Sequence, residues 1–125
     1  MAKRAIEIES KSLSANRKPN RRSPAGTEAV NLDAVIHERV RLAIIGALAV
    51  NDELSFNDLK KLLEITDGNL SVHARKLEDA GYVKCSKSFV GRQPRTTFRL
   101  TAPGRRALEN YLEQMESVIR SARKS

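Results

Sequence analysis

Basic and polar side chains that can donate hydrogen bonds to an anion are concentrated between Asp67 and Arg106. From Tyr82 to Arg106 the chain has seven Lys or Arg residues and no Asp or Glu. Mixed charge would serve solubility better than a segment of one sign, so this excess indicates a polyanionic partner. The chemistry predicted here is binding of phosphates and base edges, with no bond made or broken.

The first element of this segment is a short helix with a polar outward face. In the run DGNLSVHARKLEDAG, Asp67 is the candidate N-cap and Gly81 the C-terminal stop. Leu70, Ala74 and Leu77 recur at helical spacing, which commits one face to a core. We expect the other face and its flanks to contact nucleic acid. The candidate residues are Asn69, Ser71, Val72, His73, Arg75 and Lys76.

A β-hairpin with a basic tip follows this helix. In YVKCSKSFVGRQPRTTFRL, β-branched and aromatic residues flank a GRQP turn, which predicts strands from about Val83 to Phe89 and from Thr96 to Leu100. The candidate tip residues are Arg92, Gln93 and Arg95. A polar-faced helix followed by a basic hairpin is the order of parts that docks on duplex DNA in a winged helix-turn-helix.

Two preceding helices must hold this pair in place. The run LDAVIHERVRLAIIGALAV predicts a first helix ending near Val50, with an inward stripe of Val35, Ile36, Val40, Ala43, Ile44, Ala47 and Leu48. A short strand near Leu54 is expected to pair with the hairpin. Ser55 or Asn57 opens a second helix whose predicted inward residues are Phe56, Leu59, Leu62 and Leu63. The connector from Glu64 to Asp67 is as short as a helix-turn-helix requires.

A final helix of about 18 residues follows the hairpin, with Thr101 as its cap and Pro103 in its first turn. Its later apolar residues lie beyond a small core, because a helix rises ~1.5 Å per residue. An uncovered stripe needs a partner, so we expect a two-fold dimer through this helix. The alternative is that the helix folds back on its own domain. The candidate dimer residues are Leu108, Tyr111, Leu112, Met115 and Ile119.

The 125 residues accommodate one domain with tails. We assign residues 1–30 to a basic, largely disordered arm, 31–102 to the winged helix-turn-helix, and 103–125 to the dimerisation helix. The arm has a charge of +5 from Met1 to Gly26 and either reaches DNA or is a solvated tail. No apolar run is long enough for a membrane span or a signal peptide, which predicts a cytoplasmic protein without membrane partners.

Catalysis, metal binding and cofactor binding are not expected. The chain has no nucleophile beside a base and no Gly-rich phosphate loop before a helix. Cys85 is the only cysteine, so we expect an ordinary strand residue rather than a redox sensor. No further metal ligand stands at the required spacing from His73. Two interpretations of His73 stay open, a hydrogen bond to DNA and a partly buried structural histidine.

The run TDGNLSVHARKLEDAGYVKCSKSFVGRQPRTTFRLTAPGRRAL resembles the winged-helix transcriptional regulators of bacteria and archaea, in the broad MarR and ArsR group. The resemblance covers roughly Val35 to Met115. It implies that the third helix enters the major groove, that the hairpin (the wing) touches a minor groove or the backbone, and that terminal helices dimerise. The metal ligands of the metal-sensing members are absent here.

The sequence therefore predicts a mainly α fold with a small β-hairpin wing (α+β), in the order α-α-α-β-β-α. The predicted function is that of a sequence-specific double-stranded DNA-binding transcriptional regulator, a homodimeric repressor that reads a pseudo-palindromic operator. The alternative is a winged-helix protein-interaction or architectural module. Neither the operator sequence nor a small-molecule effector follows from the residues.

Overall fold

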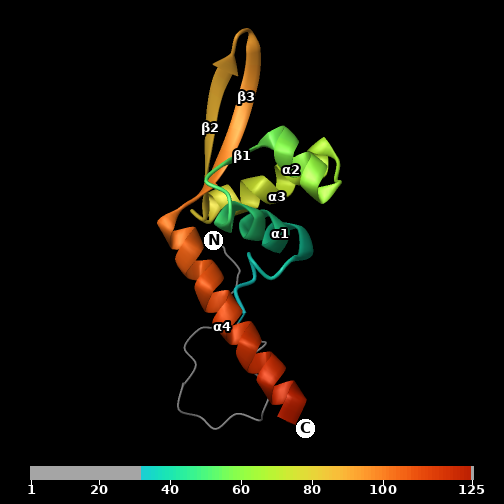
Figure 1. The fold of residues 1–125 in the computed structure, drawn as a ribbon, viewed down its shortest axis with the longest axis vertical. Helices are drawn as coiled ribbons and strands as arrows, with labels where there is room; N and C mark the ends of the chain where they lie inside the picture. The colour runs from blue at the N-terminus through green and yellow to red at the C-terminus, as the bar shows by residue number, and fades with distance from the viewer. Residues whose placement is uncertain (1–31, 125) are drawn as a thin grey trace.

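Four helices and a three-stranded antiparallel sheet make up the computed structural model, which describes residues 32–124 (Figure 1). The elements are α1 (Arg39–Ala49), β1 (Leu54–Ser55), α2 (Phe56–Leu63), α3 (Asp67–Asp79), β2 (Val83–Val90), β3 (Gln93–Leu100) and α4 (Ala102–Lys124). This order confirms the predicted fold, including the short strand at Leu54. The predicted basic arm, residues 1–30, lies outside the described residues. No helix within 32–124 is long and apolar enough to cross a bilayer.

The first helix begins at Arg39, later than its apolar stripe predicts. The Asp33 carboxylate accepts the backbone N–H groups of Val35 (2.8 Å) and Ile36 (3.3 Å), which holds the preceding segment in a turn. Glu38 is extended (φ −153°), and its side chain accepts the N–H of Arg41 as the N-cap. Ile36 is fully buried even though it lies outside the helix.

α1 is buried on more sides than the predicted stripe allowed. Ile45, which the stripe omitted, is fully buried, whereas Ala43, which the stripe included, is exposed. The reason is that α1 contacts α2, α3, α4 and β3, so its surroundings are not a single plane. Such a central helix is covered around much of its circumference, and a one-sided pattern cannot describe it.

α2 begins with a capping box. The Ser55 hydroxyl accepts the N–H of Asp58 (3.0 Å), and the Asp58 carboxylate accepts the N–H of Ser55 (3.2 Å). These hydrogen bonds from Ser55 lower the pKa of Asp58. Leu59 is fully buried, but Leu62 is 59% exposed, so its predicted inward position is wrong. The eight-residue helix presents only a narrow face to the core, and Leu63 occupies that face instead.

The hairpin is longer than predicted and extends past the helices (Figure 1). β3 lies between β1 and β2; it pairs with β2 over eight residues but with β1 only at Leu54 and Ser55. The turn consists of Gly91 and Arg92 alone, so the predicted four-residue turn is too long. Gly91 has a φ of +64° at the first turn position, where type II′ hairpins place glycine.

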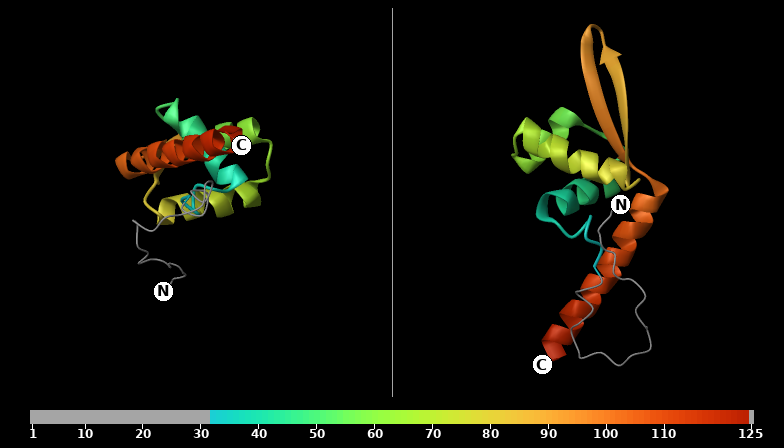
Figure 2. Two further views of the ribbon diagram at one scale, coloured as in Figure 1. Left: turned by 90° about the horizontal axis from the view of Figure 1, so that it is seen from below. Right: turned by 180° about the vertical axis from the view of Figure 1, so that it is seen from behind.

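α4 has 23 residues, five more than predicted, and Pro103 lies in its first turn as expected. The Thr101 hydroxyl accepts the N–H of Gly104 (3.0 Å) and donates to the carbonyl of Gly81 (2.6 Å), which fixes the start of α4 against the end of α3. From there the helix runs away from the hairpin, passes α1 and projects beyond the other helices (Figures 1 and 2). Its buried residues, Gly104, Leu108 and Tyr111, all lie in its first half.

Candidate nucleic-acid interface

The start of α3 is fixed by Thr66, not by the predicted Asp67. Thr66 is extended (φ −77°, ψ 161°), and its hydroxyl accepts the N–H of Asn69 (3.1 Å). Asp67 is the first helical residue, and its carboxylate is 2.7 Å from the Lys60 ammonium of α2. At the other end Gly81 has a φ of +81°, as a C-terminal stop requires. Both ends of α3 are therefore held.

One face of α3 is buried and the opposite face is free. Leu70, Ala74 and Leu77 belong to the core, as predicted from their spacing. Val72 is 54% exposed, and the remaining outward residues are also exposed, namely Asn69, Ser71, Arg75 and Lys76. Arg75 is 4.0 Å from Asp79, a distance at which an exposed pair contributes little stability. Its guanidinium remains available to another anion.

His73 faces α1 rather than the outward side of α3. The Arg41 guanidinium donates to its Nδ1 (3.1 Å), and Glu38 Oε1 is 3.5 Å from the same nitrogen. Only 16% of the His73 side chain is exposed. Of the two interpretations left open by the sequence, the structure matches the partly buried histidine. We therefore omit His73 from the candidate DNA-binding surface, which corrects the sequence-based set.

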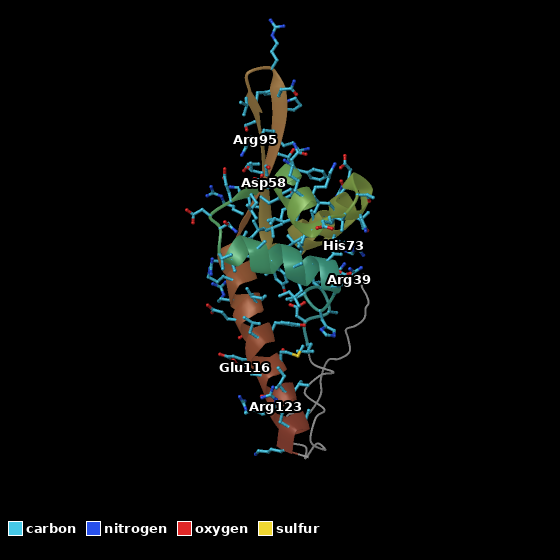
Figure 3. The ribbon with its side chains drawn as sticks, turned by 45° about the vertical axis from the view of Figure 1, so that its right-hand side comes forward. Arg39, Asp58, His73, Arg95, Glu116 and Arg123 are labelled. Atoms are coloured by element: carbon cyan, nitrogen blue, oxygen red, sulfur yellow. The ribbon has the colours of Figure 1, made fainter. Side chains whose placement is uncertain are left out.

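The predicted wing residues are exposed at the far end of the hairpin. Arg92 is in the turn, Gln93 begins β3, and Arg95 follows two residues later. Within residues 32–124 neither guanidinium has a carboxylate closer than 4.0 Å. Arg95 lies at the opposite end of the molecule from Glu116 and Arg123 of α4 (Figure 3). The distal hairpin is therefore a projecting, positively charged element without an ion pair in the described part of the chain, although Arg95 is close enough to Asp58 of α2 to interact with it electrostatically.

A hollow of about 240 Å³ lies between α3 and the hairpin. Ser71 and Arg75 line it from α3, and Lys87 and Thr96 line it from the strands. Lys87 is a site residue that the sequence analysis missed. Side chains alternate along a strand, so Lys87 shares a face with Cys85 and with the buried Val83, and this alternation was the available signal.

Two other basic residues of the segment are already engaged within the protein. Arg99 is 3.1 Å from the Glu53 carboxylate, and Arg105 donates to the carbonyl of Ala49 at the end of α1 (3.4 Å). The excess of positive charge counted between Tyr82 and Arg106 therefore overstates what a polyanion meets. Of the remaining basic residues, Lys87, Arg92 and Arg95 lie toward the tip, whereas Lys84 is at the base of the hairpin and Arg106 is on α4.

The predicted dimer residues divide into two groups. Leu108 is 8% exposed and Tyr111 3% exposed, and the Tyr111 hydroxyl is hydrogen-bonded to Nδ1 of His37 (2.8 Å). Both belong to the core of their own domain, so their assignment to a dimer contact is corrected. Leu112 is 48% exposed and Ile119 is 44% exposed. Met115, which lies between them in the chain, is partly buried.

Cys85 is a partly buried strand residue. Burial raises the pKa of its thiol, and the nearby Glu78 carboxylate adds to this, so the reactive thiolate is disfavoured. Within the described part of the chain, no three His, Cys, Asp or Glu side chains converge in a way that would hold a metal ion.

Comparison with known proteins identifies the family. The model of the winged helix DNA-binding domain matches residues 40–119. An uncharacterized protein of Methanocaldococcus jannaschii is 36% identical over 81 residues, which are 65% of this chain and 88% of that protein. The match covers every element from α1 to most of α4, so it includes both parts of the candidate interface.

Two solved structures have the same arrangement. The transcriptional regulator homologue of Pyrococcus horikoshii has a TM-score of 0.71 and 30% identity, over 78% of this chain and 96% of its own. A regulator of the MarR family from Enterococcus faecalis has a TM-score of 0.65 over 82% and 92%, but its 19% identity shows the fold alone. The chain thus belongs to the winged helix DNA-binding domain family, whose fold is that of DNA-binding transcriptional regulators and not of enzymes.

Proposed function

We propose that this protein is a sequence-specific regulator that binds double-stranded operator DNA as a homodimer and represses transcription by occluding a promoter. The observation that carries the proposal is the free polar face of α3 beside a projecting basic hairpin. The major groove of B-DNA is about 12 Å wide and admits one helix. In this arrangement α3 reads bases there while the hairpin binds the neighbouring backbone or minor groove.

Base recognition is assigned to the exposed residues of α3. The Arg75 guanidinium suits a bidentate contact with guanine, and the methyl groups of Val72 suit the methyl group of thymine. Asn69 and Ser71 are near the N-terminus of α3, where the helix dipole favours a phosphate. Lys76, at the far end of the exposed face, is assigned to the backbone.

The hairpin supplies binding that does not depend on sequence. Arg92 and Arg95 are exposed and form no ion pair within residues 32–124, and Gln93 between them can donate to a phosphate or a sugar. Lys87 stands on the side of the hairpin that faces α3, so it is assigned to the phosphates between the two grooves. Electrostatic contacts of this kind provide much of the affinity and make it depend on salt.

Dimerisation is assigned to the second half of α4. An apolar strip of Leu112, Met115 and Ile119 continues past the last buried residue, Tyr111, with no element of the described chain covering it fully. A two-fold axis through this strip places two copies of α3 on one face of the duplex. The two half-sites are then about 34 to 36 Å apart and related by the same two-fold axis, which makes the operator pseudo-palindromic.

Selection from random duplexes tests the DNA-binding proposal. We expect repeated binding and amplification to enrich a two-fold-symmetric sequence, and a footprint on it to protect two half-sites about one helical turn apart. Enrichment of no sequence, with equal affinity for all duplexes, would contradict the specific reader and favour the architectural module. Promoter-directed transcription in vitro, with the selected site placed over the start, then tests repression.

Sedimentation equilibrium tests the dimer. We expect the wild-type chain to be a dimer at micromolar concentration and Ile119→Asp to dissociate, because the substitution buries a charge in an apolar contact. Glu116→Ala is the control, since Glu116 is an exposed polar residue of the same helix. A monomeric wild-type chain would refute the assignment.

A further inference from the structure

The tip of the hairpin is apolar as well as basic. Phe89 is 73% exposed and Val90 60% exposed, and Pro94, directly opposite Phe89, is exposed too. Single exposed apolar residues are common on proteins, but Phe89 and Pro94 are cross-strand partners on one face of the hairpin and form a patch there, while Val90 projects to the other face. β1 ends at Ser55, opposite Thr97, and the start of α2 lines a hollow beside the hairpin but leaves Val90 and Pro94 exposed. Stability of the domain does not explain why these side chains are here.

Phe89 is on the side of the hairpin that faces α3. Alternate residues of a strand share one face, so Cys85, Lys87 and Phe89 project to the same side. Cys85 and Lys87 line the hollow against α3, and Phe89 continues that face beyond the body of the domain. A duplex that occupies the free face of α3 therefore lies on the side of the hairpin from which the Phe89 ring projects.

We propose that Phe89, backed by Pro94, is an apolar wedge that enters the minor groove beside the α3 site, separates two stacked base pairs there and bends the duplex. The inference rests on the proposed function, because it requires α3 and the hairpin to bind the same duplex. Architectural DNA-binding proteins use Phe, Pro and aliphatic residues in this way, with kinks of about 20° to 90°.

Charge selects DNA over a second copy as the occupant of this patch. Arg92, Arg95 and Lys87 surround the apolar residues, and no Asp or Glu is found between Tyr82 and Arg106. Two such tips would repel each other, whereas phosphates on both sides of a groove would attract one tip. Arg92, in the turn, enters first, and Phe89 lies three residues before it, in β2.

The wedge also predicts which sequences flank the half-sites. Unstacking is easiest at pyrimidine-purine steps, so a TA or CA/TG step is expected where the tip inserts. This preference arises from the deformability of DNA and requires no hydrogen bond from Phe89. It is separate from the bases that α3 contacts.

The test measures bending separately from binding. The probe is a duplex of about 25 base pairs selected by the wild-type protein, long enough for two half-sites and short enough for energy transfer between a donor and an acceptor dye at its ends. We expect wild-type protein to shorten the distance between the dyes and Phe89→Ala to lose most of that change. The dependence of affinity on salt stays at the wild-type slope, because no charge is removed.

Two further variants make the result specific. Phe89→Leu keeps an apolar wedge and retains the bend, and Leu62→Ala, which truncates another exposed apolar residue, on α2, leaves the bend unchanged. The wedge is refuted if Phe89→Ala bends the duplex as the wild-type protein does, if Phe89→Leu also loses the bend, or if bound wild-type protein leaves the duplex straight. Failure of the wild-type protein to bind any duplex would instead remove the proposed function.

Discussion

Removal of the two tip arginines offers a quantitative test of how the hairpin binds. Arg92 and Arg95 are exposed and form no ion pair within residues 32–124, so Ala at both positions leaves the core unchanged. We expect the double variant to fold like the wild-type protein. Any loss of affinity then belongs to the contact with DNA.

The expected size follows from counterion release. Each phosphate neutralised contributes about 0.9 to the slope of log affinity against log salt, so two arginines contribute about 1.8. Between about 50 mM and 200 mM salt, a fourfold change, this slope difference changes the affinity ratio of the two proteins by about 12-fold. The advantage of the wild-type protein is largest at low salt.

Fluorescence anisotropy with a labelled duplex over this salt range measures both slopes. The selected site and a scrambled duplex should lose affinity almost equally, because phosphate contacts carry no sequence information. Arg99→Ala is the matched control, since Arg99 is paired with Glu53 and should leave the slope unchanged. An unaltered slope in the double variant, or a loss confined to the selected site, would refute the assignment of the tip to the backbone.

Three other predictions concern the base readout and the fold. Replacing thymine by uracil in the selected site should weaken DNA binding by the wild-type protein by about 0.8 kcal/mol, or about fourfold, but should not change binding by Val72→Ala. Binding titrations with the two duplexes measure both effects. Equal losses in the two proteins would contradict a methyl contact. The Ser55 hydrogen bonds lower the pKa of Asp58, so the stabilisation they provide is present above the ordinary carboxyl pKa and lost as pH falls through the lowered value. Urea denaturation should therefore show a smaller loss of stability in acid for Asp58→Asn than for the wild-type protein. Matching losses would count against a stabilising role of the Asp58 carboxylate. A Cβ on Gly104 would be 2.1 Å from the carbonyl oxygen of Tyr82, so Gly104→Ala should destabilise the domain by about 1 to 3 kcal/mol. Gly46→Ala, with nothing within 4 Å, should stabilise it slightly in the same denaturation assay, and similar effects at both glycines would argue against the close packing of α4 on the hairpin.

Local signals in the sequence were enough to predict the order of the elements. Glycine at Gly81 has the positive φ that a helix stop requires, and Ser55 has the hydroxyl that caps α2. The paired strands were recognisable because β-branched and aromatic residues flank Gly91. Each of these features depends on residues within a few positions of one another, so no knowledge of the packing was needed.

The exposed face of α3 was also predictable, because the spacing of Leu70, Ala74 and Leu77 defines its opposite side. The identity of the residues on the flanks of that face was not. His73 is at the edge of the polar face, and it is turned inward by Arg41 and Glu38, which are more than thirty residues earlier in the chain. No pattern within α3 contains that information.

What the sequence determined by itself was the set of elements, the side of α3 that is free, and the basic hairpin beside it. The tertiary structure decided which of the residues predicted to point inward or outward are exposed to solvent. Leu62 and Ala43 are exposed, whereas Ile45, Leu108 and Tyr111 are buried, because burial depends on which distant elements pack around a helix. Periodicity describes one chain segment at a time, and the environment of a side chain is set by segments that only folding brings together.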